Sequence, residues 1–283
     1  MKVLLDYFEL KKNLELIFKK AGIDDFADID WIMVEVTGKK RSELPFHGDF
    51  SAEEISKIMQ AVQKRIEHVP LAYIFGKTNF FGYDLEVNEN VLIPRLDTEV
   101  LIEKIVEDIA QQNKQVSVLD IGTGSGAIAI VIQKETGAKV TAVDVSEKAL
   151  EIAKINAKNN ESEVKFVHSN LFENIPDLKF DFIVSNPPYI ESETVKGLEP
   201  EVVENEPILA LDGGEDGLDF YRKIIFDAPK HLNKNGKLYF EIGYNQAEAV
   251  SNLMKKEFKN IKVFKDYGNN DRVVVGEKIW LKD

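Results

Sequence analysis

The 283-residue sequence contains no cysteine, only four histidines and no long hydrophobic run. Without cysteine it can form neither disulfides nor thiolate metal sites, and it has no cysteine nucleophile, which is compatible with a reducing compartment. The histidines are too widely spaced to indicate a metal cluster. No apolar stretch approaches the roughly 20 residues of a membrane span. The N-terminal stretch MKVLLDYFELKK contains acids, so we expect no signal peptide and a cytoplasmic protein.

The sequence also lacks an excess of positive charge. Its 36 Lys and Arg residues are outnumbered by 49 Asp and Glu residues, for a formal net charge of −13. Proteins that bind duplex DNA draw much of their affinity from basic side chains that release counterions. The composition therefore disfavours a DNA substrate, although a local basic groove is compatible with it.

Three segments with different hydrophobic patterns divide the chain. Residues 1–75 predict a helical domain, with amphipathic stretches and a capping box formed by Ser51 and Glu54. Residues 76–92 combine aromatic and branched residues with glycine and asparagine, which predicts a β-hairpin linker. Residues 93–283 form the third segment, in which strands and helices alternate.

The alternation in the third segment predicts an α/β fold. Such units form a mostly parallel, Rossmann-like sheet with helices on both faces. The last two strand-like runs are separated only by GNND, which predicts an antiparallel C-terminal hairpin. The expected strands are 116–121, 139–144, 164–168, 180–185, 237–243, 261–267 and 272–278, and the expected helices are 125–135, 146–159, 217–232 and 245–258.

A glycine-rich loop follows the first of these strands. Gly122, Gly124 and Gly126 lie between a strand and a helix, where glycine permits positive φ and close approach of a ligand. Asp144 ends the next strand, and its two carboxylate oxygens suit the two hydroxyls of a ribose. We favour this nucleoside site over a glycine turn that only packs a helix against a strand. The loop alone does not choose between NAD and S-adenosylmethionine (AdoMet), because Gly122, Gly124 and Ala127 also satisfy the dinucleotide fingerprint.

Residues beside the loop are further candidates. Asp120 precedes the glycines, where it can meet the amino group of AdoMet, orient the loop or cap the turn. Asn170 follows the third strand together with Leu171 and Phe172. The asparagine suits the amine of an adenine, and either hydrophobe suits the wall beside its ring or the core.

The sequence NPPY, from Asn186 to Tyr189, ends the fourth strand, because proline cannot donate to a sheet ladder. An amide or aromatic amine is a poor nucleophile, so its N–H groups need acceptors that hold it in line with a methyl donor. The Asn186 side-chain oxygen and the Pro187 carbonyl can accept these hydrogens, and Tyr189 can pack against a flat substrate group. This chemistry favours AdoMet over NAD, although Asn-Pro also occurs in ordinary turns.

Several stretches together resemble one family. They are PLAYIFGKTNFFG, LIPRLDTEVL, LDIGTGSGAIAI, NPPY, EPILALDGGEDGLDFYRKI and LYFEIGYNQAEAV. In this order they resemble the peptide chain release factor glutamine methyltransferases, the HemK-type protein N5-glutamine methyltransferases. NPPY alone is shared with adenine methyltransferases that act on DNA. The resemblance implies methyl transfer from AdoMet to the glutamine side-chain amide of the Gly-Gly-Gln motif in class I release factors, with the N-terminal helices helping to dock the substrate. Nothing in the sequence suggests an obligate dimer, and we expect a monomer.

The resemblance also implies site residues by position. AdoMet is expected to contact Gly122, Thr123, Gly124, Ser125, Gly126, Asp144, Leu171 and Asn186. The glutamine is expected to lie against Asn186, Pro187, Pro188 and Tyr189. The residues that depart from the family pattern are Ala72, Leu96, Asn170 and Leu171.

Some alternatives remain open on the sequence. The motifs are compatible with an adenine-N6 methyltransferase of nucleic acid, a ribosomal-protein glutamine methyltransferase, or a nucleotide-binding regulatory protein without turnover. The acidic stretch 199–216 is expected to be a solvated loop or to face a basic surface of the partner.

Overall fold

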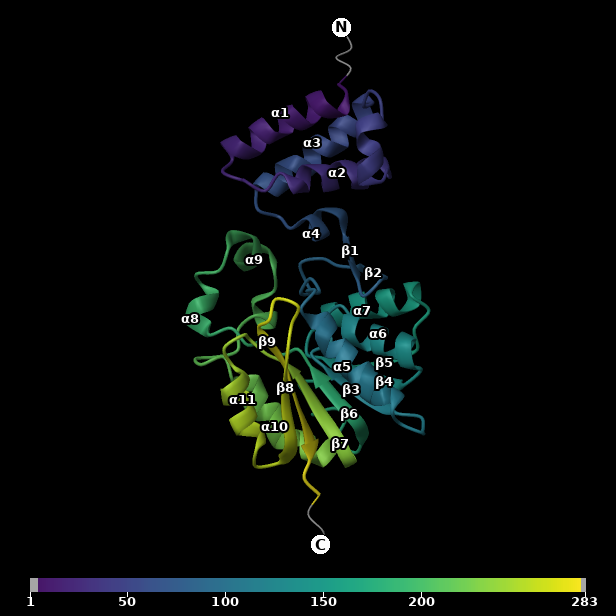
Figure 1. The fold of residues 1–283 in the computed structure, drawn as a ribbon, viewed down its shortest axis with the longest axis vertical. Coiled ribbons are helices and arrows are strands. Elements are labelled where there is room, and N and C mark those ends of the chain that lie inside the picture. The colour runs from purple at the N-terminus through teal and green to yellow at the C-terminus, as the bar shows by residue number, and fades with distance from the viewer. Residues whose placement is uncertain (1–4, 281–283) are drawn as a thin grey trace. The chain divides into compact units, whose positions relative to one another are not determined.

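The computed structural model describes residues 5–280. The chain divides into two compact units: one contains the residues up to Gly76 together with Pro200–Asn205, and the other contains Lys77–Glu199 and the residues from Glu206 onward. Figure 1 labels their helices and strands. Within the described residues, no helix combines the length and the apolar character needed to cross a membrane.

The first unit is helical. Its core is built from buried side chains that include Leu14, Phe18, Ile29, Ile32 and Ile58. Its elements are α1 (Tyr7–Lys20), α2 (Ala27–Thr37), the 3₁₀ helix η1 (Arg41–Phe46), α3 (Ala52–Ile66), α4 (Leu71–Phe75) and α9 (Pro200–Asn205).

Local capping explains where α3 begins and where α1 ends. The Ser51 hydroxyl accepts from the Glu54 amide at 3.2 Å, and the Glu54 carboxylate accepts from the Ser51 amide at 2.7 Å, which confirms the predicted capping box. Gly22 follows α1 with φ +79°, a conformation that suits glycine at a helix end. Helix α2 has no side-chain cap, so the start signal that reveals α3 in the sequence is missing there.

Part of the acidic stretch belongs to this helical unit. Helix α9 contributes Glu201, whose carboxylate lies 2.8 Å from the guanidinium of Arg65. The same guanidinium is 2.6 Å from Asp28, and the Asn205 side chain donates to the His68 carbonyl at 3.0 Å. The expectation of a continuous solvated loop over residues 199–216 is therefore wrong, because ion pairing binds this part of the stretch to the helices.

The second unit contains a seven-stranded sheet with the order β5-β4-β3-β6-β7-β9-β8. The first five strands in this order are parallel, and β9 runs antiparallel to both of its neighbours, β7 and β8. This arrangement confirms the predicted α/β fold class. A separate hairpin, β1 (Lys77–Phe80) and β2 (Tyr83–Glu86), precedes the sheet. The sheet strands are β3 (Ser117–Ile121), β4 (Lys139–Asp144), β5 (Val164–His168), β6 (Phe180–Ser185), β7 (Leu232–Glu241), β8 (Phe258–Lys265) and β9 (Asp271–Lys278).

Helices cover both faces of this sheet, as Figure 1 shows. Neighbouring strand residues such as Val118 and Leu119 enter different core clusters because side chains alternate along a strand. One cluster includes side chains of α5 (Thr98–Ala110), α6 (Ala127–Thr136) and α7 (Glu147–Asn159), and the other those of α10 (Asp219–His231) and α11 (Ala247–Met254). The remaining short helices are α8 (Ser192–Val195) and η2 (Ile208–Ala210).

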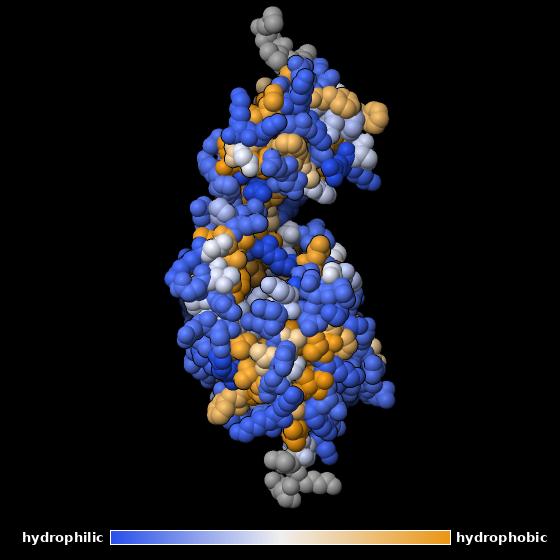
Figure 2. All heavy atoms as spheres, turned by 60° about the vertical axis from the view of Figure 1, so that its left-hand side comes forward, coloured by the Kyte–Doolittle hydropathy of each residue, from blue (hydrophilic) through white to orange (hydrophobic). Residues whose placement is uncertain are grey.

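The face of the molecule drawn in Figure 2 is largely polar. On the face drawn in Figure 2 most side chains are hydrophilic, and hydrophobic ones occur in small groups between them. This pattern is ordinary for a protein surface, on which scattered apolar residues need no special explanation.

The sheet order places two loops next to each other. Strand β3 pairs with β4 on one side and with β6 on the other, so the chain reverses its direction of travel across the sheet at β3. Ile121, the last residue of β3, lies opposite Ser185, the last residue of β6. Open α/β sheets bind ligands at such a switch point, outside the carboxyl ends of the strands.

Candidate active site

The glycine loop after β3 has an open side and a packed side. Gly122 and Gly124 have φ of +72° and +53°, and a Cβ built on either would meet nothing within 4 Å. A Cβ on Gly126 would lie 3.1 Å from Ala153 Cβ and 3.2 Å from Ile130 Cδ1. The first two glycines therefore leave space for a ligand, whereas the third permits close packing of α6 against α7.

Asp120, in strand β3, hydrogen-bonds to the glycine loop from within the core. It is fully buried, and its Oδ2 accepts from the Thr123 hydroxyl at 2.6 Å. Burial raises the pKa of the Asp120 carboxyl to about 7, and the nearby charge of Asp144 acts in the same direction. Of the roles considered for Asp120, the structure favours orientation of the loop, since the residue does not line the cavity.

Asp144 lies beside the open side of the loop. One oxygen accepts from the Gly124 amide at 2.8 Å and the other accepts from the Ser146 amide at 2.8 Å. The Val145 amide also hydrogen-bonds to this carboxylate. A carboxylate has about four acceptor sites, so Asp144 keeps acceptor capacity where it lines the cavity. Burial raises the pKa of this carboxyl, against the effect of the backbone hydrogen bonds.

A cavity of about 140 Å³ lies outside β3 and β6. The glycine loop lines it with Gly122 and Gly124, and the NPPY turn lines it with Asn186, Pro187 and Pro188. The structure thus brings the two predicted motifs to one site. Further lining comes from segments that include 90–92, 144–146, 169–171 and 207–210.

The segment after β5 resolves a choice that the sequence left open. Leu171 lines the cavity, while Phe172 is buried in the core and stacks on the His231 ring at 4.5 Å between centroids. Ser169 fixes this turn, because its hydroxyl donates to the Leu171 carbonyl at 2.9 Å and accepts from the Asn174 amide at 3.0 Å. Leu171 is therefore the candidate wall for an adenine ring.

Histidines do not form a metal site in the described part of the chain. No group of three or more His, Asp or Glu side chains within residues 5–280 is arranged to hold a metal ion. His231 instead packs in the core, where burial lowers its pKa and its Nδ1 lies 3.1 Å from the Leu178 carbonyl.

Tyr189 is the last residue of the NPPY turn. It packs against the hydrophobic cluster of the sheet and does not line the cavity. Burial raises the pKa of its hydroxyl to about 12. Thr123, Ser125 and Gly126 are buried and Tyr189 is half-buried, and none of these four predicted site residues lines the cavity.

A glycine-rich segment, residues 211–217, packs closely on the NPPY turn. The Ile190 amide donates to the Leu211 carbonyl at 3.0 Å, and the Gly213 amide donates to the Ile190 carbonyl at 2.8 Å. A Cβ on Gly213 would lie only 2.8 Å from the Pro188 oxygen and from the Tyr189 Cα. The sequence analysis missed this function, for which the closely spaced glycines of LDGGEDG are the available signal.

Asn156 is a second structural residue that the sequence analysis missed. It is fully buried in α7, and its side-chain oxygen accepts from the Glu86 amide at 2.6 Å. Its amide nitrogen donates to the carbonyls of Glu86 and Ser125, both at 2.9 Å. Asn156 thereby ties the end of β2, in the β1–β2 hairpin, to the glycine loop.

Comparison with known proteins identifies the family. The PrmC N-terminal domain matches residues 9–76, and the Methyltransferase small domain matches residues 95–199. A release factor glutamine methyltransferase from Fusobacterium nucleatum is 38% identical over 281 residues, which cover 97% of this chain and 78% of the relative. One from Bacillus anthracis is 41% identical over 278 residues, which cover 95% and 98%. The chain belongs to the release factor glutamine methyltransferase family.

Membership of the release factor glutamine methyltransferase family confirms the resemblance found in the sequence and the predicted enzyme class. It does not favour the nucleic-acid alternative. A methyltransferase of solved structure from Pyrococcus furiosus shares the fold, with a TM-score of 0.52 and 23% identity over 70% of this chain and 90% of that one.

Proposed function

We propose that the protein transfers the methyl group of AdoMet to the side-chain amide nitrogen of the glutamine in the Gly-Gly-Gln motif of class I release factors, as a cytoplasmic monomer. One observation carries the proposal. A single cavity is lined by the glycine loop with Asp144 and by Asn186 and Pro187 of the NPPY turn. Family membership supports the choice of substrate.

The residues on the glycine-loop side fit a nucleoside. The space in front of Gly122 and Gly124 admits a ligand close to the backbone. The remaining acceptor capacity of Asp144 suits a ribose hydroxyl, and Leu171 offers an apolar wall. When bound there, AdoMet supplies an activated methyl group and its own leaving group.

The NPPY turn would act on the glutamine. The lone pair of a carboxamide nitrogen is delocalised, so the nitrogen must be oriented toward the methyl carbon. In the proposal, Asn186 Oδ1 and the Pro187 carbonyl accept its two hydrogens and stabilise the positive charge that develops on the nitrogen. The new carbon–nitrogen bond forms as the carbon–sulfur bond breaks, and one N–H proton is then lost to water.

Asp144→Ala is expected to weaken AdoMet binding by about 1–3 kcal/mol, the cost of losing hydrogen bonds to a charged group. Isothermal titration calorimetry measures this directly. Asp144→Asn is the matched variant, because it keeps the side-chain volume and one acceptor oxygen, and we expect it to lose less affinity. Unchanged affinity in the alanine variant would rule out the ribose assignment.

The helical unit is the proposed docking domain for the release factor. Its described surface exposes the aromatic residues Phe8, Trp31 and Phe46, of which Phe46 is 86% exposed. Exposed aromatic side chains of this kind are frequent anchors in protein interfaces.

Radiolabelled AdoMet tests the function. We expect label to enter a class I release factor and to be absent from the same factor with its Gly-Gly-Gln glutamine replaced by alanine. Duplex DNA and ribosomal proteins are offered separately as alternative substrates. Label in DNA but not in release factor would overturn the proposal, and NAD binding without any transfer would favour a regulatory nucleotide-binding protein.

A further inference from the structure

A buried carboxyl group lies behind the NPPY turn, outside the set of residues that line the cavity. Glu241, the last residue of β7, is 2% exposed. It follows Phe240, which lies opposite Ser185 in the β6–β7 pair, so Glu241 comes beside Asn186. Burial raises the pKa of its carboxyl, and hydrogen bonding to Thr98 and Asn186 acts in the opposite direction. Its Oε2 has no hydrogen-bond partner among the described residues. A buried carboxylate with an unsatisfied oxygen carries a large free-energy cost, so its presence beside the NPPY turn calls for an explanation.

The neighbours of Glu241 determine which way the Asn186 side-chain amide is turned. Asn186 Nδ2 donates to Thr98 Oγ1 at 3.4 Å. Because Thr98 Oγ1 accepts from the amide, its own proton is available for the Glu241 carboxylate. The nitrogen of Asn186 is thus held on the side of Thr98 and Glu241. The amide oxygen, on the opposite side of Cγ, is left for the cavity that Asn186 lines.

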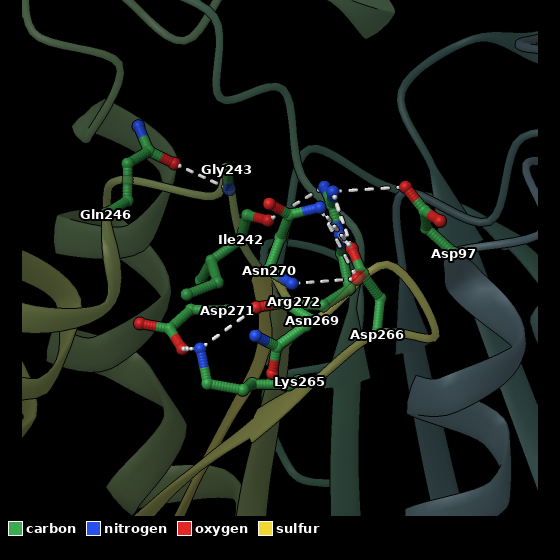
Figure 3. A network of polar contacts seen from close by, with 10 residues as sticks. All are labelled: Asp97, Ile242, Gly243, Gln246, Lys265, Asp266, Asn269, Asn270, Asp271 and Arg272. Carbon is green, nitrogen blue, oxygen red and sulfur yellow. Dashed lines mark hydrogen bonds and ion pairs between the residues drawn. The ribbon is translucent and has the colours of Figure 1, made fainter.

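Arg272 bonds to Asp97 and Ile242, the sequence neighbours of Thr98 and Glu241 (Figure 3). Its Nη1 donates to the Ile242 carbonyl at 3.2 Å, and its Nη2 lies 3.0 Å from Asp97 Oδ2. Ile242 directly follows Glu241 in the sequence, and Asp97 directly precedes Thr98. The guanidinium also pairs with Asp266, at 3.1 Å, which anchors it to the β8–β9 hairpin.

We propose that Glu241 is a positioning residue for methyl transfer, which together with Thr98 holds the Asn186 amide with its oxygen toward the substrate. The inference rests on the proposed function, in which Asn186 Oδ1 accepts a hydrogen from the glutamine amide. A flipped Asn186 would instead direct its own N–H groups at those of the substrate, and two facing donors repel. An ionised Glu241 prevents this flip, because a carboxylate can only accept hydrogen bonds.

The ionisation state of Glu241 therefore determines which groups donate and which accept in the hydrogen bonds among Glu241, Thr98 and Asn186. Burial raises the pKa of this carboxyl to about 7, Arg272 lowers it and Asp97 raises it. The other titratable groups that interact with it are Tyr189 and Tyr221. A protonated Glu241 can donate to Thr98, which can then donate to the Asn186 oxygen and stabilise the flipped amide. Activity should accordingly fall as the pH drops through about 7.

Single-turnover methyl transfer at saturating AdoMet, measured from pH 5.5 to pH 8.5, tests the inference on the full-length protein. We expect the wild-type rate to fall as the pH drops through about 7 and then to level off, because a protonated carboxyl keeps one acceptor oxygen and can stabilise both orientations of Asn186. Glu241→Gln, a neutral variant of the same shape, can stabilise either orientation of Asn186. Because neither orientation is then favoured, its rate should be lower by about twofold or more at pH 8 and independent of pH, with the dissociation constant of AdoMet unchanged.

Two further variants separate positioning from folding. Thr98→Val removes the hydroxyl at constant shape and should lower the same rate, whereas Thr98→Ser should recover most of the loss. A full wild-type rate in Glu241→Gln at pH 8 would overturn the inference. A low-pH loss that persists in Glu241→Gln would also overturn it and assign the titration to Asp120, whose pKa is likewise about 7. Failure of the wild-type protein to label release factor would instead count against the proposed function.

Discussion

Replacing Asn186 with alanine should abolish most turnover while AdoMet binding falls only modestly. The side chain provides one of the two acceptors for the glutamine N–H groups, and removal of one preorganised hydrogen-bonding group in an active site typically costs about 10²–10³-fold in kcat. The glycine loop and Asp144 remain intact in this variant. Steady-state kinetics with release factor and calorimetry with AdoMet measure the two effects separately.

Asn252→Ala is the matched control for this experiment. Asn252 is an exposed residue of α11, so the same truncation there should leave kcat close to that of the wild-type protein. A wild-type kcat in Asn186→Ala would show that the side-chain oxygen does not act in the transition state. A loss of AdoMet affinity as large as the loss of kcat would place Asn186 in cofactor binding alone.

Gly213→Val should reduce turnover by at least about 10²-fold, because a displacement of roughly 1 Å in an active site can cost this much. A Cβ on Gly213 would lie 2.8 Å from both the Pro188 oxygen and the Tyr189 Cα. The added side chain must therefore push the NPPY turn away from its position. Gly213 does not line the cavity, so AdoMet affinity should change much less than kcat.

Gly197→Ala provides the matched glycine control. A Cβ on Gly197 would have only the Thr194 oxygen nearby, at an ordinary 3.7 Å, and kcat should stay close to the wild-type value. Thermal unfolding of each variant shows whether the protein remains folded. Normal turnover in a folded Gly213→Val would contradict the claim that residues 211–217 hold the turn in place.

The sequence predicted the sheet and the meeting of the two motifs for a clear physical reason. Strands alternate with helices, and loops that follow parallel strands emerge at the same edge of a sheet. Asp144 and the glycines could be assigned to that edge from their positions at strand ends. Pairing of β3 with β6 then places Asn186 beside the glycine loop.

The supporting residues could not be predicted, because their partners are distant in the sequence. Thr98 and Asn186 are 88 positions apart, and Asn156 and Glu86 are 70 apart. Nothing local distinguishes Glu241 from an ordinary strand glutamate. Likewise, only packing decides that Leu171 faces the cavity and Phe172 the core.

A crystal structure with S-adenosylhomocysteine and a Gly-Gly-Gln peptide tests the central claim most directly. We predict that the glutamine amide nitrogen lies about 3 Å from both Asn186 Oδ1 and the Pro187 carbonyl oxygen, with its lone pair directed at the sulfur. A glutamine bound away from these two oxygens, or an Asn186 amide that presents its nitrogen to the substrate, would contradict the account.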